Sequence, residues 1–204
     1  MTVHSFTLGP LENNCFVVEN DKRCIIIDVP MGIEPLIAFI KNRKLDPEAV
    51  LLTHGHFDHI GGLAELKQNR KIPIYIYRDD APFLVDDDLN GSVFFGFPGC
   101  STPADKTFED GQVLEIAGMK IKVLHTPGHT AGGVCFLIEK DLFAGDTLFN
   151  SGVGRTDLPG GSMKAIKDSI RSKLFKLPPD TRVYPGHGPE TTIDFEMKSN
   201  PFVR

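Results

Sequence analysis

Short apolar runs alternate with amphipathic stretches along the first half of the chain. The run Cys24–Asp28 begins with four consecutive apolar residues, which is typical of a strand buried on both faces. Residues 33–43 carry an apolar stripe at helical spacing, made of Ile33, Leu36, Ile37 and Ile40. Further strands are predicted at Phe16–Glu19, Ala49–Thr53 and Ile72–Tyr77, and a short helix at Leu63–Asn69. This alternation predicts an α/β protein.

The second half of the chain repeats the arrangement with two predicted hairpins. Their strands are Val113–Ile116 with Met119–His125, and Val134–Ile138 with Asp141–Ala144. Ser162 is a suitable N-cap for a helix whose apolar stripe consists of Ile166, Ile170 and Leu174. A last strand is predicted at Arg182–Tyr184. Because each half consists of strands followed by an apolar-faced helix, we expect two sheets packed back to back with helices outside.

Residues 86–105 form the longest segment without a clear period. The segment contains three consecutive aspartates at 86–88 and the phenylalanine-rich stretch Phe94–Gly99. An active-site lid and a partner contact are both compatible with it, beside simple packing on the surface, which is common for long loops.

Composition and charge exclude several classes of protein. The 204 residues include 20 glycines and 15 prolines, above the usual share of about 12%, which indicates many defined turns. The net charge of −5 without a basic run argues against a nucleic-acid partner, and no apolar run reaches the ~20 residues of a membrane helix. The N-terminus lacks a signal-peptide pattern, and the four cysteines form no Cys-x-x-Cys motif. We therefore expect a cytoplasmic protein with free, buried thiols.

Histidines are the clearest chemical signal. Three of the seven lie within six residues, in the sequence Thr53-His54-Gly55-His56-Phe57-Asp58-His59, directly after a predicted buried strand. Imidazole nitrogens and a carboxylate that converge on one point are ligands for divalent metals. Three more segments combine a strand, a glycine turn and a potential ligand: they end at His129, Asp146 and His187. Packing alone gives no reason to gather these groups.

Together these four segments resemble the motifs of the metallo-β-lactamase superfamily, in the same order along the chain. The resemblance extends from the first strands through His187. It implies a four-layer αβ/βα sandwich of two mixed β-sheets flanked by helices, with a metal site at one edge between the sheets. We expect residues 1–204 to form a single domain of this kind, without a C-terminal helical substrate domain.

The resemblance also implies a set of metal ligands. One site would use His54, His56 and His129, and the second would use Asp58, His59 and His187. Asp146 would bridge the two metals. Because all seven positions carry a suitable residue, we expect a catalytic member of the superfamily with two zinc ions per chain; iron and manganese are alternatives to zinc.

Asp146 narrows the choice of reaction within the superfamily. Many β-lactamases of the superfamily have a cysteine here, whereas hydrolases of thioesters and phosphoesters have an acid, so antibiotic hydrolysis is not expected. The segments Gly154–Leu158 and Tyr184–Gly188 resemble the glyoxalase II-like (hydroxyacylglutathione hydrolase-like) and persulfide dioxygenase-like subgroup. We therefore expect a small thioester or thiol-derived substrate, and the sequence leaves monomer and homodimer open.

The expected reaction is hydrolysis of a glutathione-type thioester by a metal-bound hydroxide. Asp58 or Asp146 would orient that hydroxide. Arg155 is the candidate anchor for an anionic substrate, because the resemblance places its loop beside the metals. An internal ion pair between Arg155 and Asp157 that only shapes the loop is an equally good interpretation.

A second enzyme class uses the same residues differently. Two histidines and one carboxylate with open positions suit ferrous iron and oxygen activation. Persulfide dioxygenases resemble this chain, and by that resemblance His54, His129 and Asp146 would hold one iron. The other four residues would then surround the iron ligands. A regulatory or metal-storage protein without turnover fits the intact ligand set less well.

Overall fold

A six-stranded mixed sheet forms the first half of the protein in the computed structural model, which describes residues 1–203. Its strands follow each other in chain order: β1 (Thr2–Leu8), β2 (Asn13–Asn20), β3 (Arg23–Ile27), β4 (Asp46–Leu51), β5 (Ile74–Tyr77) and β6 (Lys106–Phe108). Strands β1 to β3 pair antiparallel, and β3 to β6 pair parallel.

A second six-stranded sheet has the order β14-β13-β10-β9-β8-β7. Its strands are β7 (Val113–Ile116), β8 (Met119–His125), β9 (Val134–Ile138), β10 (Asp141–Gly145), β13 (Arg182–Pro185) and β14 (Thr191–Thr192). Only the β10–β13 pair is parallel. A small separate pair, β11 (Leu148–Phe149) and β12 (Gly152–Val153), follows β10.

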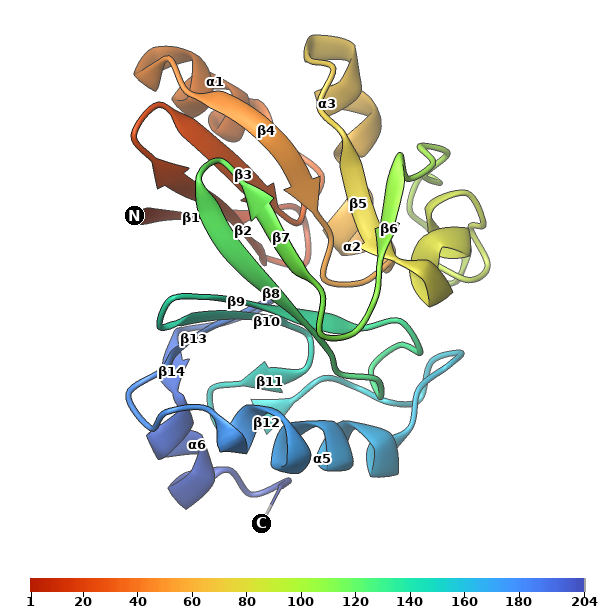
Figure 1. The fold of residues 1–204 in the computed structure, drawn as a ribbon. Coiled ribbons are helices and arrows are strands. Elements are labelled where there is room, and N and C mark those ends of the chain that lie inside the picture. Colours follow the sequence, from red (N-terminus) through yellow and green to blue (C-terminus); the bar gives the residue numbers. More distant parts are fainter. Residues whose placement is uncertain (204) are drawn as a thin grey trace.

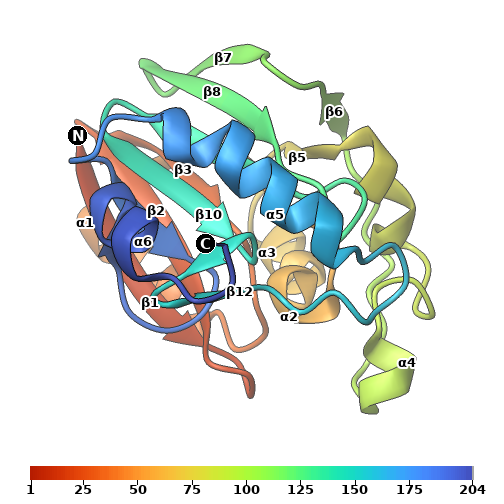
Figure 2. The ribbon, with the colours of Figure 1, turned by 90° about the horizontal axis from the view of Figure 1, so that it is seen from below.

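Helices cover the outer faces of both sheets, as Figure 1 shows. The α-helices are α1 (Glu34–Arg43), α2 (Phe57–Ile60), α3 (Leu63–Asn69), α4 (Ser92–Phe95), α5 (Met163–Ser172) and α6 (Ile193–Ser199), and 3-10 turns span Arg78–Leu84 and Leu174–Lys176. Helices α1 and α3 lie on the first sheet, and α5 and α6 lie on the second, as Figures 1 and 2 show. The predicted four-layer αβ/βα sandwich is confirmed.

The alternation of side chains along β3 explains the layers. Cys24 and Ile26 pack in the apolar cluster between the first sheet and its helices, whereas Ile25 and Ile27 pack in the cluster between the two sheets. All four are fully buried, which confirms the expectation of a strand covered on both faces. A third cluster lies between the second sheet and α5, and it includes Ile166, Ile170 and Leu174. Each buried Ile or Leu contributes about 1.5–3 kcal/mol.

The local predictions agree with the structure over most of the chain. Ser162 caps α5, since its hydroxyl accepts a hydrogen bond from the Ala165 amide at 3.2 Å. All four cysteines are free and buried. The sequence pattern missed β1 because this edge strand is half exposed and carries little apolar contrast. It also missed α6, which is only seven residues long and begins at the cap formed by Thr192.

Within residues 1–203, no helix combines the length and apolar character needed to cross a bilayer.

Candidate metal centre

The predicted ligands come from strand ends that meet at one edge of the two sheets. His54 and His56 follow β4, and Asp58 and His59 lie in α2 directly after them. His129 lies in the turn between β8 and β9. The remaining two, Asp146 and His187, follow β10 and β13, which pair in parallel and therefore deliver both side chains to the same edge.

Two groups of side chains converge there. His54, His56 and His129 each offer a nitrogen within 4.8 Å of the others, with 2.8 Å between His56 Nδ1 and His129 Nε2. Asp58, His59 and His187 form the second group with the same spread, and His187 Nε2 lies 3.1 Å from Asp58 Oδ2.

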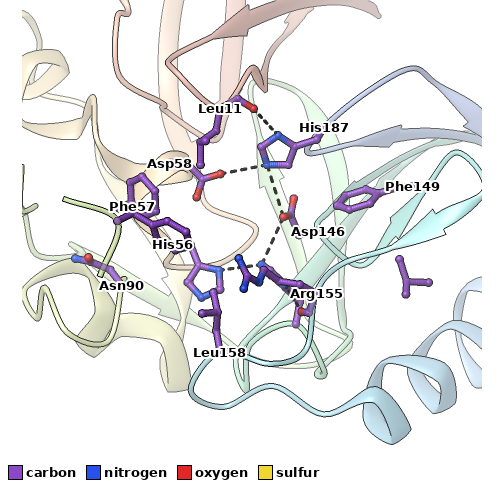
Figure 3. A pocket seen from close by; sticks show the side chains of 13 residues that line it. Leu11, His56, Phe57, Asp58, Asn90, Asp146, Phe149, Arg155, Leu158 and His187 are labelled. Atoms are coloured by element: carbon purple, nitrogen blue, oxygen red, sulfur yellow. Dashed lines mark hydrogen bonds and ion pairs between the residues drawn. The ribbon is translucent and has the colours of Figure 1, made fainter. Parts of the chain in front are cut away.

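Asp146 lies between the two groups. One of its carboxylate oxygens, Oδ1, is 3.2 Å from His59 Nε2. The other, Oδ2, is 3.5 Å from His129 Nε2 and 3.7 Å from His187 Nε2. Figure 3 shows Asp58, Asp146 and His187 pointing toward one another, with His56 on the opposite wall. The fold thus brings together all seven predicted residues, in the arrangement expected of a bridging carboxylate.

Buried polar atoms without a partner show that a metal fits this site. Among the described residues, His56 Nε2, His59 Nε2 and Asp146 Oδ1 are buried and accept or donate no hydrogen bond. Such orphaned atoms are rare in folded proteins. Two of them, His59 Nε2 and Asp146 Oδ1, face each other between the ligand groups, where a divalent cation would satisfy both. Imidazole and carboxylate donors suit zinc, iron and manganese alike.

Four of the seven predicted ligands have the protonation state that ligates metals. Burial, reinforced by the neighbouring imidazoles, lowers the pKa of His54 well below its usual value and that of His56 to about 3, so both rings are neutral donors. Burial opposes ionisation of Asp58 and Asp146, but the positive charge of His59 outweighs it and lowers the pKa of both carboxyls. The nearby carboxylates outweigh burial and raise the pKa of His59 and His187, so these two rings have to release a proton when a metal binds.

Asp28 fixes the position of His59. Its carboxylate accepts hydrogen bonds from His59 Nδ1 at 2.8 Å, from the Thr53 amide at 2.8 Å and from Thr53 Oγ1 at 2.7 Å. Asp28 is 1% exposed and has a left-handed backbone with φ of 57°. Because Nδ1 is held by this carboxylate, Nε2 must face the site. The sequence analysis predicted no function for Asp28. The signal that could have indicated one is an acidic residue directly after a buried apolar strand.

Asp80 joins the two loops that carry the first ligand group. Its carboxylate accepts hydrogen bonds from the amides of Gly55 and Gly132, at 3.1 and 2.7 Å, and from Thr130 Oγ1 at 2.7 Å. Burial outweighs these bonds and raises the pKa of Asp80. The residue was not predicted, because one of two aspartates in a 3-10 turn has no distinguishing pattern. His129 is oriented separately, since its Nδ1 donates to the Arg155 carbonyl at 2.7 Å.

Glycines give the ligand loops room to approach each other. A Cβ atom on Gly186 would lie 2.2 Å from Asp146 Oδ1 and 2.8 Å from His59 Cε1. A Cβ on Gly154 would lie 1.9 Å from the Asp146 carbonyl oxygen. Part of the glycine excess seen in the composition therefore serves close contacts at this site.

A cavity of about 500 Å³ opens above the ligands. Its walls combine ligand residues with the apolar side chains Leu11, Phe95, Phe149, Val153 and Leu158. Arg155 also lines the cavity, and at the same time its Nε and Nη2 donate to the two carboxylate oxygens of Asp157 at 2.8 Å each. The ion pair and the position beside the metal site, which the sequence left as alternatives, are both present.

Two stacked αβ layers with histidine and aspartate side chains converging at their common edge define a metal-binding αβ/βα sandwich. The family model of the metallo-beta-lactamase superfamily matches residues 8–187. The chain therefore belongs to this superfamily and is assigned to its metal-dependent hydrolases.

Similar proteins agree with this assignment along almost the whole chain. The "Probable metallo-hydrolase YqgX" of Bacillus subtilis is 40% identical, over 96% of this chain and 94% of its own length. The "Hydroxyacylglutathione hydrolase GloC" of Haemophilus influenzae is 36% identical, over 100% of this chain and 98% of its own.

Two solved structures are similarly close. The BLEG-1 B3 metallo-beta-lactamase superposes with a TM-score of 0.96 at 40% identity, over 99% of each chain. TTHA1623, solved in a di-iron-bound form, superposes with a TM-score of 0.89 at 41% identity, over 98% of this chain and 100% of its own.

Proposed function

We propose that the protein hydrolyses a glutathione-type thioester in the manner of glyoxalase II, with two zinc ions per chain. The observation that carries the proposal is the carboxylate of Asp146 between two ligand groups, at the base of a cavity with a guanidinium on its wall. The likeness to GloC of Haemophilus influenzae, a hydroxyacylglutathione hydrolase, supports the same class of substrate.

The two acids on the cavity wall would handle the water and its proton. Bound divalent metals activate water and stabilise negative charge on a carbonyl oxygen. Asp58 and Asp146 both line the cavity and are ionised, so each can accept a hydrogen bond from the attacking water and orient it. Asp58 is itself fixed by His187, whose Nδ1 donates to the Leu11 carbonyl at 3.0 Å while Nε2 faces the carboxylate.

Arg155 would anchor a carboxylate of the thiol portion. Asp157 accepts hydrogen bonds from Nε and Nη2, and a guanidinium has five N–H donors in all. The remaining donors stay available to an incoming anion, so the ion pair holds the side chain at the cavity wall without exhausting it. The pair therefore positions the proposed anchor.

The test combines metal analysis with turnover of S-lactoylglutathione. Protein purified without added metal should contain about two zinc ions per chain. After reloading, it should hydrolyse S-lactoylglutathione and release free thiol. Two zinc ions without release of thiol from any glutathione thioester would refute the substrate class while leaving the hydrolase assignment intact.

Iron-dependent persulfide oxidation is a second candidate. TTHA1623, at 41% identity, was solved in a di-iron-bound form, which favours iron as the metal but not the single-iron arrangement. In that case His54, His129 and Asp146 would hold a single iron. One iron per chain together with oxygen uptake on glutathione persulfide would establish it in place of the thioesterase.

β-Lactam hydrolysis has to be assayed beside these two. The sequence argues against it through the acid at position 146, whereas the 40% identity to the BLEG-1 B3 metallo-beta-lactamase favours it. Turnover of nitrocefin by the zinc-loaded protein at a rate comparable with that of the thioester would overturn the argument from Asp146.

A further inference from the structure

A second cavity of about 390 Å³ adjoins the one above the metal ligands. The two cavities share three wall residues, His56, Arg155 and Leu158. The second cavity is therefore adjacent to the place where the reacting bond of a substrate would lie. The first cavity alone accounts for the reacting centre and leaves this neighbouring space without a function.

The walls of the second cavity are mainly apolar. One side is formed by residues 88–97, which include α4 and are called the α4 segment here, and the other side by the loop after Arg155. The apolar side chains on the two sides are Leu89, Val93, Phe94, Leu158 and Pro159. Val93 is 62% exposed and Phe94 is 77% exposed, the two highest values among the large hydrophobic residues of the described chain. Neighbouring exposed apolar side chains that line a cavity are typical of a binding site.

The α4 segment is anchored on the metal site itself. Phe57, which lies between His56 and Asp58, stacks on Phe97 with ring centroids 4.9 Å apart and packs against Phe95 at 5.4 Å. The Phe57 amide also donates to the Asn90 carbonyl at 3.0 Å. Phe95 and Phe97 therefore hold the segment in place, and Phe94 packs edge-on against Phe95 with ring centroids 5.0 Å apart.

The charged residues and apolar walls of this cavity favour the acyl half of a thioester over its thiol half. Asp88 and Asp157 lie on its wall, and the guanidinium of Arg155 stands at the boundary with the first cavity. The thiol half of a glutathione thioester is a charged peptide with two carboxylates and one ammonium group, which would lose hydration against the mainly apolar walls. Its acyl half carries no charge and can be apolar.

We propose that the second cavity is a subsite for the acyl group of the substrate, and that it selects aliphatic or aromatic acyl groups over small polar ones. This inference rests on the proposed thioesterase function and adds to it the class of acyl group. Figure 2 shows α4 standing out from the body of the protein, and the exposed side chains of Val93 and Phe94 in this helix line the cavity.

A binding experiment tests the subsite without turnover. S-alkylglutathiones are thioethers that the enzyme cannot hydrolyse, and calorimetry with the metal-loaded protein measures their Kd. From S-methyl through S-butyl and S-hexyl to S-octyl, each added methylene should lower Kd about two- to threefold, somewhat less than the value for full burial because the subsite is partly open. A Kd independent of chain length would overturn the proposal.

A kinetic experiment assigns the effect to the proposed residues. The ratio of kcat/KM for S-octanoylglutathione to that for S-acetylglutathione should fall about tenfold in Phe94→Ser. The matched control is Phe195→Ser, because Phe195 on α6 is also exposed, at 44%, and lines neither cavity. That variant should keep the wild-type ratio.

The outcomes separate this inference from the function on which it rests. Absence of thioester hydrolysis with a preserved chain-length effect on S-alkyl binding would refute the thioesterase and retain the apolar subsite. Hydrolysis with equal efficiency for acetyl and octanoyl substrates would refute the subsite and retain the thioesterase. If Phe94→Ser converts a dimer to a monomer in sedimentation and leaves the octanoyl-to-acetyl ratio unchanged, the exposed side chains contact a second copy and the subsite is refuted.

Discussion

Replacement of Asp28 isolates the contribution of a residue that touches no metal. Asp28→Asn keeps the size of the side chain but replaces one acceptor oxygen with a donor NH₂. The three groups that now donate to the carboxylate are His59 Nδ1, the Thr53 amide and Thr53 Oγ1, so at least one of them loses its acceptor. Because the Nδ1 hydrogen bond orients Nε2 toward the site, we expect the second ligand group to bind metal about 10- to 100-fold more weakly.

Stability should fall at the same time. A hydrogen bond to a charged group contributes about 1.5–3 kcal/mol, and an unpartnered buried donor costs about 1–3 kcal/mol. Asp28→Ala, which removes all three bonds, should therefore lower the free energy of unfolding of the metal-free protein by about 3–5 kcal/mol. Asp28→Asn should lose less, since its remaining oxygen can still accept from Thr53.

Competition with a chromophoric chelator measures the metal affinity, and urea unfolding measures the stability. Asp141→Asn is the matched control: Asp141 is 2% exposed and accepts two hydrogen bonds from Arg182, at 2.7 and 2.8 Å, at the end of β10 far from the metal ligands. It should lose stability and keep its metal affinity. Equal affinities in Asp28→Asn, Asp141→Asn and the wild type would refute the argument that Asp28 positions His59.

Four further predictions address the site. Asp58→Ala should reduce thioester kcat at least a hundredfold, with an unchanged circular dichroism spectrum and a lower metal content; near-normal turnover would count against a two-metal mechanism. Arg155→Met should raise the KM for S-lactoylglutathione about tenfold with little change in kcat, whereas Asp157→Asn should leave KM equal or lower. An unchanged KM in Arg155→Met would show that Arg155 does not anchor the substrate. Gly186→Ala should abolish metal binding, because its Cβ would lie 2.2 Å from the Asp146 carboxylate. The control Gly188→Ala, with φ of +75° and nothing within 4 Å of its Cβ, should lose only about 1 kcal/mol of stability. Removal of the metals with EDTA should lower Tm by roughly 5–10 °C, because a metal ion present at about a hundred times its Kd stabilises the folded protein by about 2.7 kcal/mol. An unchanged Tm would mean that the sites are empty in the purified protein.

The sequence predicted those elements whose pattern is set by burial on one or both faces. The run at β3 and the stripe of α5 are examples, because every apolar position in them is buried. Edge strand β1 and the short helix α6 could not be predicted in this way, since β1 is half exposed and α6 is only seven residues long, so both leave little periodic signal. The same limit applies to α4, whose four residues are held by stacking on Phe57, 35 or more positions earlier.

The residues of the candidate site also differ in how far they could be predicted from the sequence. His54, His56 and Asp58 are close in sequence, so their spacing alone indicated metal chemistry. The roles of Asp28 and Asp80 were not predicted, because each accepts a hydrogen bond from a ligand loop that is more than twenty residues away in the sequence. Their hydrogen bonds exist only once the fold is formed, and a single aspartate in a sequence does not indicate its partner.

The proposed roles assign the control of metal chemistry and the choice of substrate to different parts of the molecule. The ligand loops are tied together by buried acids and by glycines that tolerate no Cβ, so few substitutions there are compatible with function. The α4 segment and the loop after Arg155 carry exposed apolar and charged side chains, among them Val93, Phe94 and Asp157, which are not among the predicted ligands. Relatives of about 40% identity with names as different as metallo-hydrolase and B3 metallo-beta-lactamase are consistent with such a division. The ligand set therefore indicates metal-dependent chemistry, and the proposed substrate class has to be tested on the side chains around Arg155 and Phe94.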